Sequence, residues 1–502
     1  MFNFYSFYIV VAFKAGNWIV YKESHSQKMC VGRITGIVVT DETTPDRWLR
    51  VQLTRKFNEL PGTMKSKERY QNSQNNNEIW LEEIRTTIRI QDVVRHTTVW
   101  IKNNSVDTST PLIFEFSIQE IIYNFNGRQK LRSVFLQHEL PVEYIIDPQP
   151  PPNQHIKHLK FFIDLYYDDF GAFNKAYHKL GGIYVQIGNM GQDLRKKLRN
   201  HFLISFVPFG AEFDDVIKEF ISDMKELQRG VLMPIKNGQV WVTVGLGMCT
   251  ADLPQGNDLA GIKRHNADYG CRICKVSQNQ LSDVKFDIFQ NGRYHHLTNR
   301  IFDEIKVARN NTLKEKIAKE NGLRLTSNIL DELSRDRHIQ IPHDPFHCLA
   351  GLARRLFEHL FKRELEPSGL NALHNAWRNF EVPSNWKRLQ SPISHFESYW
   401  MSDSLRLVMI MPFILKRYLD ASHLKQDFAN SIKENCLLTN TRQVKGEMIK
   451  TWSLFAKSCA KVFAKEFNYG NKDDYYELDQ LLIELIKSLN KVSNSRHFYL
   501  LK

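Results

Sequence analysis

Two aspartates at the ends of separate strand-like segments are the residues of this chain best suited to metal-dependent chemistry. Residues 161–170 read FFIDLYYDDF, and a second apolar segment ends at Asp252, just before Leu253-Pro254. Paired carboxylates can hold Mg²⁺ or Mn²⁺, which prefer oxygen ligands. Such ions activate a water or a 3′-hydroxyl against a phosphodiester and stabilise the leaving oxygen. Each aspartate alone fits equally well a turn that ends a strand.

The order of the elements predicts that two of these aspartates meet. Strand-like segments at 161–167, 182–187 and 202–207 precede a helix with apolar residues at helical spacing from Phe213 to Leu227, a stop at Gly230 and a fourth strand at 240–244. This order predicts an α/β chain with a ribonuclease-H-like core, a mixed sheet with flanking helices. In such a sheet the first and fourth strands are neighbours, so Asp168 and Asp252 approach each other.

Strand alternation separates the carboxylates of the first segment. Side chains alternate between the two faces of a strand, so Asp164, Tyr166 and Asp168 share one face and Asp169 lies on the other. We therefore take Asp168, rather than Asp169, as the partner of Asp252.

Cys271 and Cys274 have the spacing of half a tetrahedral zinc site. Because no second cysteine pair follows, histidines must complete it, and five are available: His265, His295, His296, His343 and His347. The step Tyr294-His295-His296 could supply His295. The alternative is a pair of reduced structural thiols.

A net charge of +13 over 502 residues favours an anionic partner, either nucleic acid or an acidic membrane surface. No apolar segment is long enough to span a membrane. Two basic clusters could contact phosphates: Arg195, Lys196 and Lys197 before the third strand, and Lys263 and Arg264 after Asp252. A charge run also fits a solvated face, and a basic protein without an anionic partner is the general alternative.

The chain divides at a proline-rich linker, 146–155, which contains DPQPPPN. Before it, 14–145 has short strand-like runs with polar breaks and is expected to form a small β-barrel, in which 66–77 is a polar loop. After it, 156–365 is the core, with a zinc-binding and helical insertion at about 255–340. The remaining residues, 366–502, are expected to be helical.

Several motifs in series resemble the catalytic core of CACTA-type (En/Spm-like, CMC superfamily) DNA transposases: LYYDDFGAF, GGIYVQIGNM, HFLISFVPFG, TADLPQGNDLAGIKRHNADYGCRIC and PHDPFHCLAGLARRLF. The resemblance covers roughly 155–365. It implies a DDE/D-type site that cuts DNA at terminal inverted repeats and transfers strands into new DNA in the nucleus. By motif match, Asp168 is the first catalytic acid, Asp252 the second and His347 a zinc ligand.

The N-terminal pattern, with GNWIVYKES, VGRITGIVV and RWLRVQL, resembles the BAH type of chromatin module. That resemblance implies a barrel surface that engages chromatin or nucleosomes, but it carries over no individual ligand residue.

The third acid departs from the family pattern. In related plant elements a Glu follows the motif His by two residues, and here that position is Leu349. Asp344 is the preferred substitute, because Glu358 lies opposite the apolar stripe of its helix and is expected to face solvent. If neither serves, the chain is a decayed or domesticated relic that binds DNA or chromatin without cutting it. A structural zinc protein unrelated to transposition is the third reading.

Overall fold

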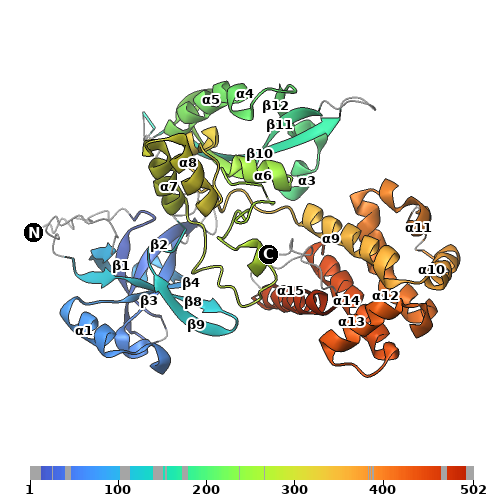
Figure 1. The fold of residues 1–502 in the computed structure, drawn as a ribbon. Helices are drawn as coiled ribbons and strands as arrows, with labels where there is room; N and C mark the ends of the chain where they lie inside the picture. The colour runs from blue at the N-terminus through green and yellow to red at the C-terminus, as the bar shows by residue number, and fades with distance from the viewer. Residues whose placement is uncertain are drawn as a thin grey trace, which may run out of the picture.

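Strands dominate the first part of the chain and helices the last in the computed structural model (Figure 1). The structure describes residues 13–24, 26–39, 47–101, 114–138, 151–152, 155–171, 179–236, 238–264, 266–382, 384, 386, 389–464 and 472–492. The expected α/β class, with a strand-rich N-terminal region and a helical C-terminal region, is confirmed at this level. Of the expected linker at 146–155, only residues 151, 152 and 155 are described.

The N-terminal region is built on a seven-stranded sheet with the order β5-β1-β2-β3-β4-β8-β9. Its elements are β1 (Trp18–Lys22), β2 (Met29–Val39), β3 (Arg47–Arg55), α1 (Lys67–Asn75), β4 (Trp80–Arg89), β5 (Val93–Thr97), β8 (Glu120–Phe125) and β9 (Arg128–Ser133), and β6 (Val99–Ile101) pairs separately with β7 (Phe116–Ile118). The pairings among the described residues leave β5 and β9 as the two edges, so they do not close the sheet into a barrel.

One N-terminal expectation is wrong. Residues 66–77 were expected to be a polar loop, yet 67–75 form α1. The helix is polar on all sides, and Ser66 starts it by accepting a hydrogen bond from the backbone N–H of Arg69 at 3.2 Å. Arg69 then fixes the helix to the sheet through an ion pair with Glu120 at 2.6 Å. These contacts outweigh the lack of an apolar stripe.

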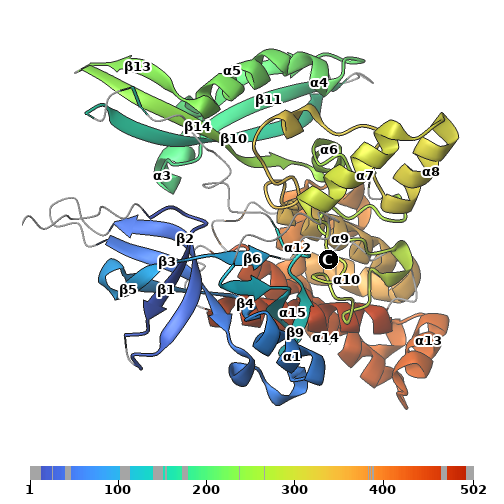
Figure 2. The same cartoon turned by 90° about the vertical axis from the view of Figure 1, so that its left-hand side faces the viewer.

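The central region carries a five-stranded sheet with the order β12-β11-β10-β14-β13 (Figure 2). Its elements are β10 (Lys157–Gly171), β11 (Lys179–Ile187), α3 (Gln192–Arg195), β12 (Phe202–Val207), α4 (Phe213–Val216), α5 (Lys218–Arg229), β13 (Val231–Ile235) and β14 (Gly238–Ala251). β10 runs parallel to β14 and antiparallel to β11. The expected strands and helix are thus confirmed as segments.

In the central sheet, the strand β13 was missed at the sequence level. α5 ends where expected, at Gly230, whose φ of 108° favours glycine and where an added Cβ would lie 2.5 Å from the Trp241 ring. The chain then turns back as a hairpin, and β13 pairs antiparallel with β14. Pro234 obscured this strand, but β13 is an edge strand, where proline is tolerated.

The insertion after β14 joins the N-terminal and central regions (Figure 1). It contains α6 (Leu253–Leu259), α7 (His295–Val307) and α8 (Asn311–Asn321). Residues from about 275 to 340 were expected to be mostly helical, but the described residues from 266 to the start of α7 are mainly turns and irregular segments. They dock on β8 and β9: Asp287 accepts hydrogen bonds from Tyr123 at 2.9 Å and Lys130 at 2.8 Å.

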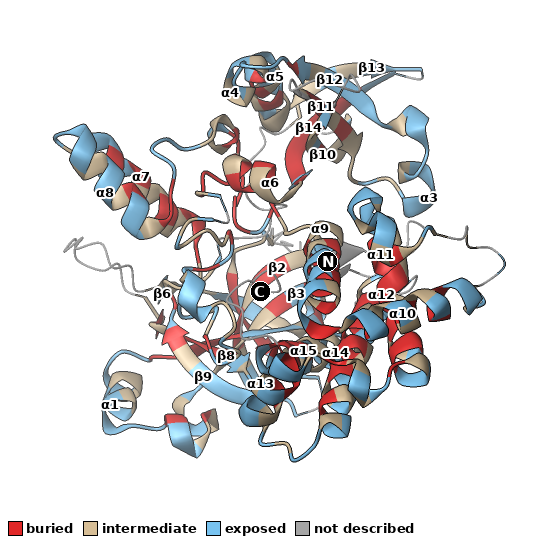
Figure 3. Ribbon diagram, turned by 45° about the vertical axis from the view of Figure 1, so that its right-hand side comes forward, coloured by how far each residue is buried: buried red, intermediate tan, exposed pale blue. Residues whose placement is uncertain are grey.

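The C-terminal region is helical, as expected. Its helices are α9 (Pro345–His359), α10 (Pro367–Asn379), α11 (Pro392–His395), α12 (Met401–Tyr418), α13 (Gln426–Cys436), α14 (Thr441–Val462) and α15 (Lys472–Val492). Buried residues gather where α9, α12, α14 and α15 meet (Figure 3). α9 was assigned to the core region, yet its stripe of Leu349, Leu352 and Leu356 packs into this helical cluster. Among the described helices, none is both long and apolar enough to cross a membrane.

Candidate metal and nucleic-acid site

The strand register brings Asp168 and Asp252 to neighbouring positions. In the parallel pair β10–β14, Tyr167 is aligned with Ala251, so the two aspartates are the next residues on adjacent strands. Neighbouring strands lie about 4.8 Å apart. The backbone pairing therefore places Asp168 beside the point where the chain leaves β14 at Asp252.

Three carboxylates act on the hydroxyl group of Tyr166. This hydroxyl donates a hydrogen bond to Asp168 Oδ2 at 2.9 Å. Burial raises the pKa of Tyr166, and the negative charges of Asp168, Asp344 and Asp252 raise this pKa further. Among the described contacts, only Asp168 hydrogen-bonds this hydroxyl, and Asp252 and Asp344 act on it through their charge.

The face assignment of the other aspartates is confirmed. Asp169 lies on the opposite face of β10, where its Oδ2 accepts a hydrogen bond from Gln255 Nε2 at 2.8 Å. Asp164 shares the Asp168 side of the strand but is occupied: it accepts from the backbone N–H of Met248 at 2.9 Å and pairs with Arg195 at 2.6 Å. Asp164 therefore fixes the strands.

Asp252 combines a structural contact with an electrostatic penalty. It precedes α6, and its Oδ1 accepts the backbone N–H of Gln255 at 2.8 Å. Burial raises the pKa of the Asp252 carboxyl, and the charges of Asp168 and Asp169 raise it further, against the Gln255 hydrogen bond and the charge of His347. A nearby cation would relieve this crowding of negative charge.

Asp344 is engaged through both carboxylate oxygens. It precedes α9, and its Oδ1 accepts the backbone N–H of Phe346 at 2.7 Å. Its Oδ2 pairs with Nδ1 of His347. A carboxylate on one ring nitrogen of a histidine is the usual way to orient the other nitrogen toward a metal ion. Glu358, the other substitute, faces solvent as expected and pairs with Lys362 at 2.6 Å.

Arg272 was not anticipated and lies beside these acids. Its side chain is fully buried, and none of its three guanidinium nitrogens has a hydrogen-bond partner among the described residues. Burial lowers its pKa to about 10, opposed by the charges of Cys348, Cys271, Asp252 and Asp344. The guanidinium packs on the α6 backbone, because a Cβ at Gly256 would lie 1.6 Å from Nη1. Its place inside the Cys-Arg-Ile-Cys motif was the only available signal.

The two thiols of the Cys-x-x-Cys motif face each other, with Cys271 Sγ and Cys274 Sγ 3.6 Å apart. Two sulfurs at about 2.3 Å from a tetrahedral zinc ion are about 3.8 Å apart. The pair therefore fits half a zinc site. Among the described residues, no three His, Cys, Asp or Glu side chains converge closely enough to hold a metal ion.

The histidines proposed to complete the zinc site have other contacts. His295 Nδ1 accepts the backbone N–H of Arg337 at 3.2 Å, and burial lowers the pKa of His295 to about 4. His296 Nε2 donates to the Phe135 carbonyl at 2.9 Å. Burial, with the charge of Arg272, lowers the pKa of His343 to about 4. His265 lies outside the described residues.

The first basic cluster is only partly available. Arg195 is tied to Asp164 and donates to Gln186 at 3.1 Å, so its guanidinium has a structural role. Lys196 and Lys197 are exposed.

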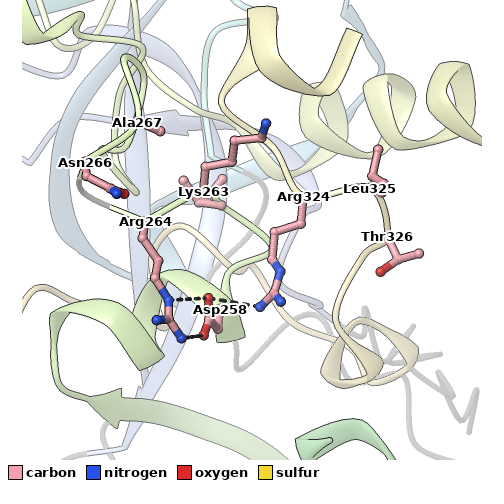
Figure 4. Close-up of a pocket in the computed structure, with 9 residues that line it drawn as sticks. Asp258, Lys263, Arg264, Asn266, Ala267, Arg324, Leu325 and Thr326 are labelled. Carbon is pink, nitrogen blue, oxygen red and sulfur yellow. Dashed lines mark hydrogen bonds and ion pairs between the residues drawn. The ribbon is translucent and has the colours of Figure 1, made fainter. Parts of the chain in front are cut away.

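The second basic cluster lines a pocket (Figure 4). Lys263 and Arg264 are joined there by Arg324, which comes from the segment after α8. Arg324 pairs with Asp258 at 2.9 Å and Arg264 pairs with the same carboxylate at 2.8 Å. Sequence reasoning found the two residues near Asp252 but not Arg324, which gives no local signal.

Comparisons with known proteins do not assign this chain to a family. No protein-family profile matches the chain, and no curated protein matches it. Among solved structures, it is similar to the crystal structure of the yeast Rsc2 BAH domain, with 16% identity and a TM-score of 0.18. That match covers 30% of this chain and 61% of the other. The chain thus spans less than two thirds of that relative, and the likeness is too small to argue from.

Proposed function

We propose that this chain is a transposable-element-derived DNA transposase that cleaves and transfers DNA strands at a DDE/D-type site. The observation that carries the proposal is the register of β10 and β14, which aligns Tyr167 with Ala251 and so brings Asp168 and Asp252 to the same end of the central strand pair. Carboxylates from distant segments that meet beside a basic pocket form the arrangement that phosphodiester chemistry needs.

The ribonuclease-H-like core is part of this proposal. In its favour, the strand order β12-β11-β10-β14 has the first strand between the second and the last, with β10 and β14 parallel. The two principal aspartates then stand at the same end of the central pair.

A catalytic Mg²⁺ or Mn²⁺ ion fits two of the three acids. Asp168 Oδ2 receives the Tyr166 hydroxyl and Asp252 Oδ1 receives the Gln255 amide, so each keeps one oxygen uncommitted among the described contacts. Both oxygens of Asp344 are engaged. Asp168 and Asp252 would therefore hold the metal, and Asp344 would join only by releasing His347.

Side chains and a helix start of the protein would orient the two metal-binding aspartates, and the basic pocket would supply positive charge for the DNA. The Tyr166 hydrogen bond fixes the rotation of Asp168, and the start of α6 fixes Asp252. The basic pocket holds the DNA strand near them. A bound divalent ion would supply the polarisation that activates the attacking hydroxyl and stabilises the leaving oxygen.

A structural Zn²⁺ would be held by Cys271 and Cys274, and His347 would become a third ligand only by moving toward the thiols, because no three such side chains converge among the described residues. The thiol separation suits it, and the Asp344 carboxylate on His347 Nδ1 leaves Nε2 for the metal. His295 remains a proposed ligand only if its Nδ1 contact changes or Nε2 turns toward the cysteines.

One observation favours the rival function, a relic that binds DNA without cutting it. Asp252 and Asp344 both begin helices, which accounts for an aspartate at each position without catalysis. In either case, nuclear localisation, self-association and chromatin binding by the N-terminal region remain proposals from sequence resemblance.

The test is plasmid nicking by the full chain in Mg²⁺ or Mn²⁺. Asp168→Asn and Asp252→Asn should each lower the rate at least about 100-fold, because a neutral amide is a poor ligand for a hard cation. Asp215→Asn is the matched control, since Asp215 is exposed and, among the described residues, forms an ion pair with Lys218 alone. Asp344→Asn separates its two roles: a third catalytic acid would lose nicking with zinc retained, whereas an orienting residue would lose zinc.

Wild-type protein that binds DNA but does not nick it would contradict the enzyme and favour the relic. Nicking that persists in Asp168→Asn would place any nuclease activity elsewhere in the chain.

A further inference from the structure

The pocket after α6 has more positive charge than its own aspartate neutralises (Figure 4). Lys263, Arg264 and Arg324 share it with a single carboxylate, Asp258. We propose that this pocket binds a backbone phosphate of the DNA strand that runs to the aspartates, with Arg324 as a contact that the sequence motifs do not contain. The inference rests on the proposed function and deepens it.

Asp258 holds the two guanidinium groups side by side. Its Oδ2 pairs with Arg264 Nη2 at 2.8 Å and its Oδ1 with Arg324 Nη1 at 2.9 Å. About half of each arginine side chain is exposed, 59% and 47%, whereas that of Asp258 is only 24% exposed. A guanidinium has five N–H donors, so both arginines keep donors for a ligand. Fixed, planar donors match a phosphate better than mobile lysines do.

Lys263 adds a third cation without a carboxylate partner among the described residues. In Figure 4 its side chain extends away from Asp258. Asn266 and Thr326 line the same pocket and supply neutral hydrogen-bonding groups. The pocket volume is about 520 Å³, enough for a phosphate with its flanking sugar.

The pocket wall is fixed by backbone pairing between distant segments. The Lys263 N–H donates to the Gly322 carbonyl at 2.9 Å, and the Arg324 N–H donates to the Gly261 carbonyl at 3.0 Å. The cations therefore stand on a preformed frame, so little conformational freedom is lost when a ligand binds.

The pocket is close enough to the aspartates to serve the same strand. Asp258 lies on α6, the helix that Asp252 begins. The Arg264 side chain also experiences the negative charges of Asp252 and Asp169. A strand held by the arginines would lie within electrostatic reach of Asp252, which favours DNA over a small free phosphate compound.

The experiment measures binding of a fluorescein-labelled DNA duplex to the full chain by anisotropy, over a series of NaCl concentrations in EDTA. Without divalent ions no cleavage occurs, so binding is read separately from catalysis. In Lys263→Ala/Arg324→Ala, the slope of log K against log salt should shrink by about 1 to 2. Lys450→Ala/Lys457→Ala on α14 is the matched control, because it removes the same charge from two exposed lysines.

Arg324→Lys tests whether the alanine variant has only a folding defect. Because it keeps the positive charge, it should keep most of the wild-type slope of log K against log salt. It should keep only part of the affinity for DNA, because a lysine cannot form the forked contact. Equal slopes in the pocket and control variants would overturn the proposal. If Lys263→Ala/Arg324→Ala lost the binding of pyrophosphate but kept the DNA slope of the wild type, the pocket would be assigned to a free phosphate compound. That result would also overturn the proposal. Nicking is scored separately, so a pocket that binds DNA in a chain that never cuts it would keep this inference and reject the enzyme.

Discussion

Two buried arginines of the insertion differ in whether their guanidinium groups are hydrogen-bonded. Arg293 donates to the carbonyls of Cys271, Asn321 and Tyr269, each at 2.8 Å. Arg272 is equally buried and has no hydrogen-bond partner among the described residues. Burial lowers the pKa of each guanidinium to about 10.

The difference separates structural charges from charges available to a ligand. Arg293 binds separate loop segments together, and Arg335 and Arg337 both pair with the nearby Asp331 of their own segment, at 2.6 and 2.7 Å. Arg272 acts on the surrounding carboxylates and thiols through its positive charge, without a hydrogen bond among the described residues. Buried polar groups are normally satisfied, so an unsatisfied one beside acids is a mark of a site rather than of a scaffold.

The largest effect is expected for Arg293→Met. The substitution leaves three carbonyls without their donor and should lower the free energy of unfolding by about 3 to 5 kcal/mol. Calorimetric melting of the full chain measures it, with Arg293→Lys as an intermediate variant that keeps the charge. An unchanged melting temperature would show that the three hydrogen bonds do not hold the loop, and would break the comparison.

Arg272→Met should behave in the opposite way. Replacing a buried, unpaired cation with an apolar side chain is expected to change stability by less than about 1 kcal/mol, or to raise it. The loss of a positive charge beside Asp252 and Asp344 should also tighten Mn²⁺ binding severalfold, as measured by titration calorimetry. A destabilisation as large as that of Arg293→Met would mean that Arg272 is structural after all.

The smallest effect is expected for Asp252→Asn in metal-free buffer. Because the folded pKa of Asp252 is raised, its ionised form is less favourable in the fold than in the unfolded chain. Asparagine removes this penalty and still begins α6, so the melting temperature should rise by roughly 2 °C at neutral pH. The gain should vanish as the pH falls through the Asp252 pKa, where the wild-type carboxyl is protonated. A gain that persists in acid would refute the electrostatic cause.

The sequence by itself determined the local elements of this protein. Alternating side chains placed Asp168 and Asp169 on opposite faces of β10, and helical spacing identified α5, with its stop at Gly230. The same reasoning identified the buried helix α12 and the last described helix, α15. These features could be read because periodicity and end signals lie within a few residues of one another.

Only the tertiary structure decided which charges are free. Arg195 was proposed to contact DNA, but its guanidinium pairs with Asp164, 31 residues earlier in the chain. Arg324, far along the sequence, enters the pocket through pairing of 261–263 with 322–324. Asp344 is committed to a helix start and to His347. Whether a charge is satisfied depends on partners that are distant in sequence, and no local pattern records those partners.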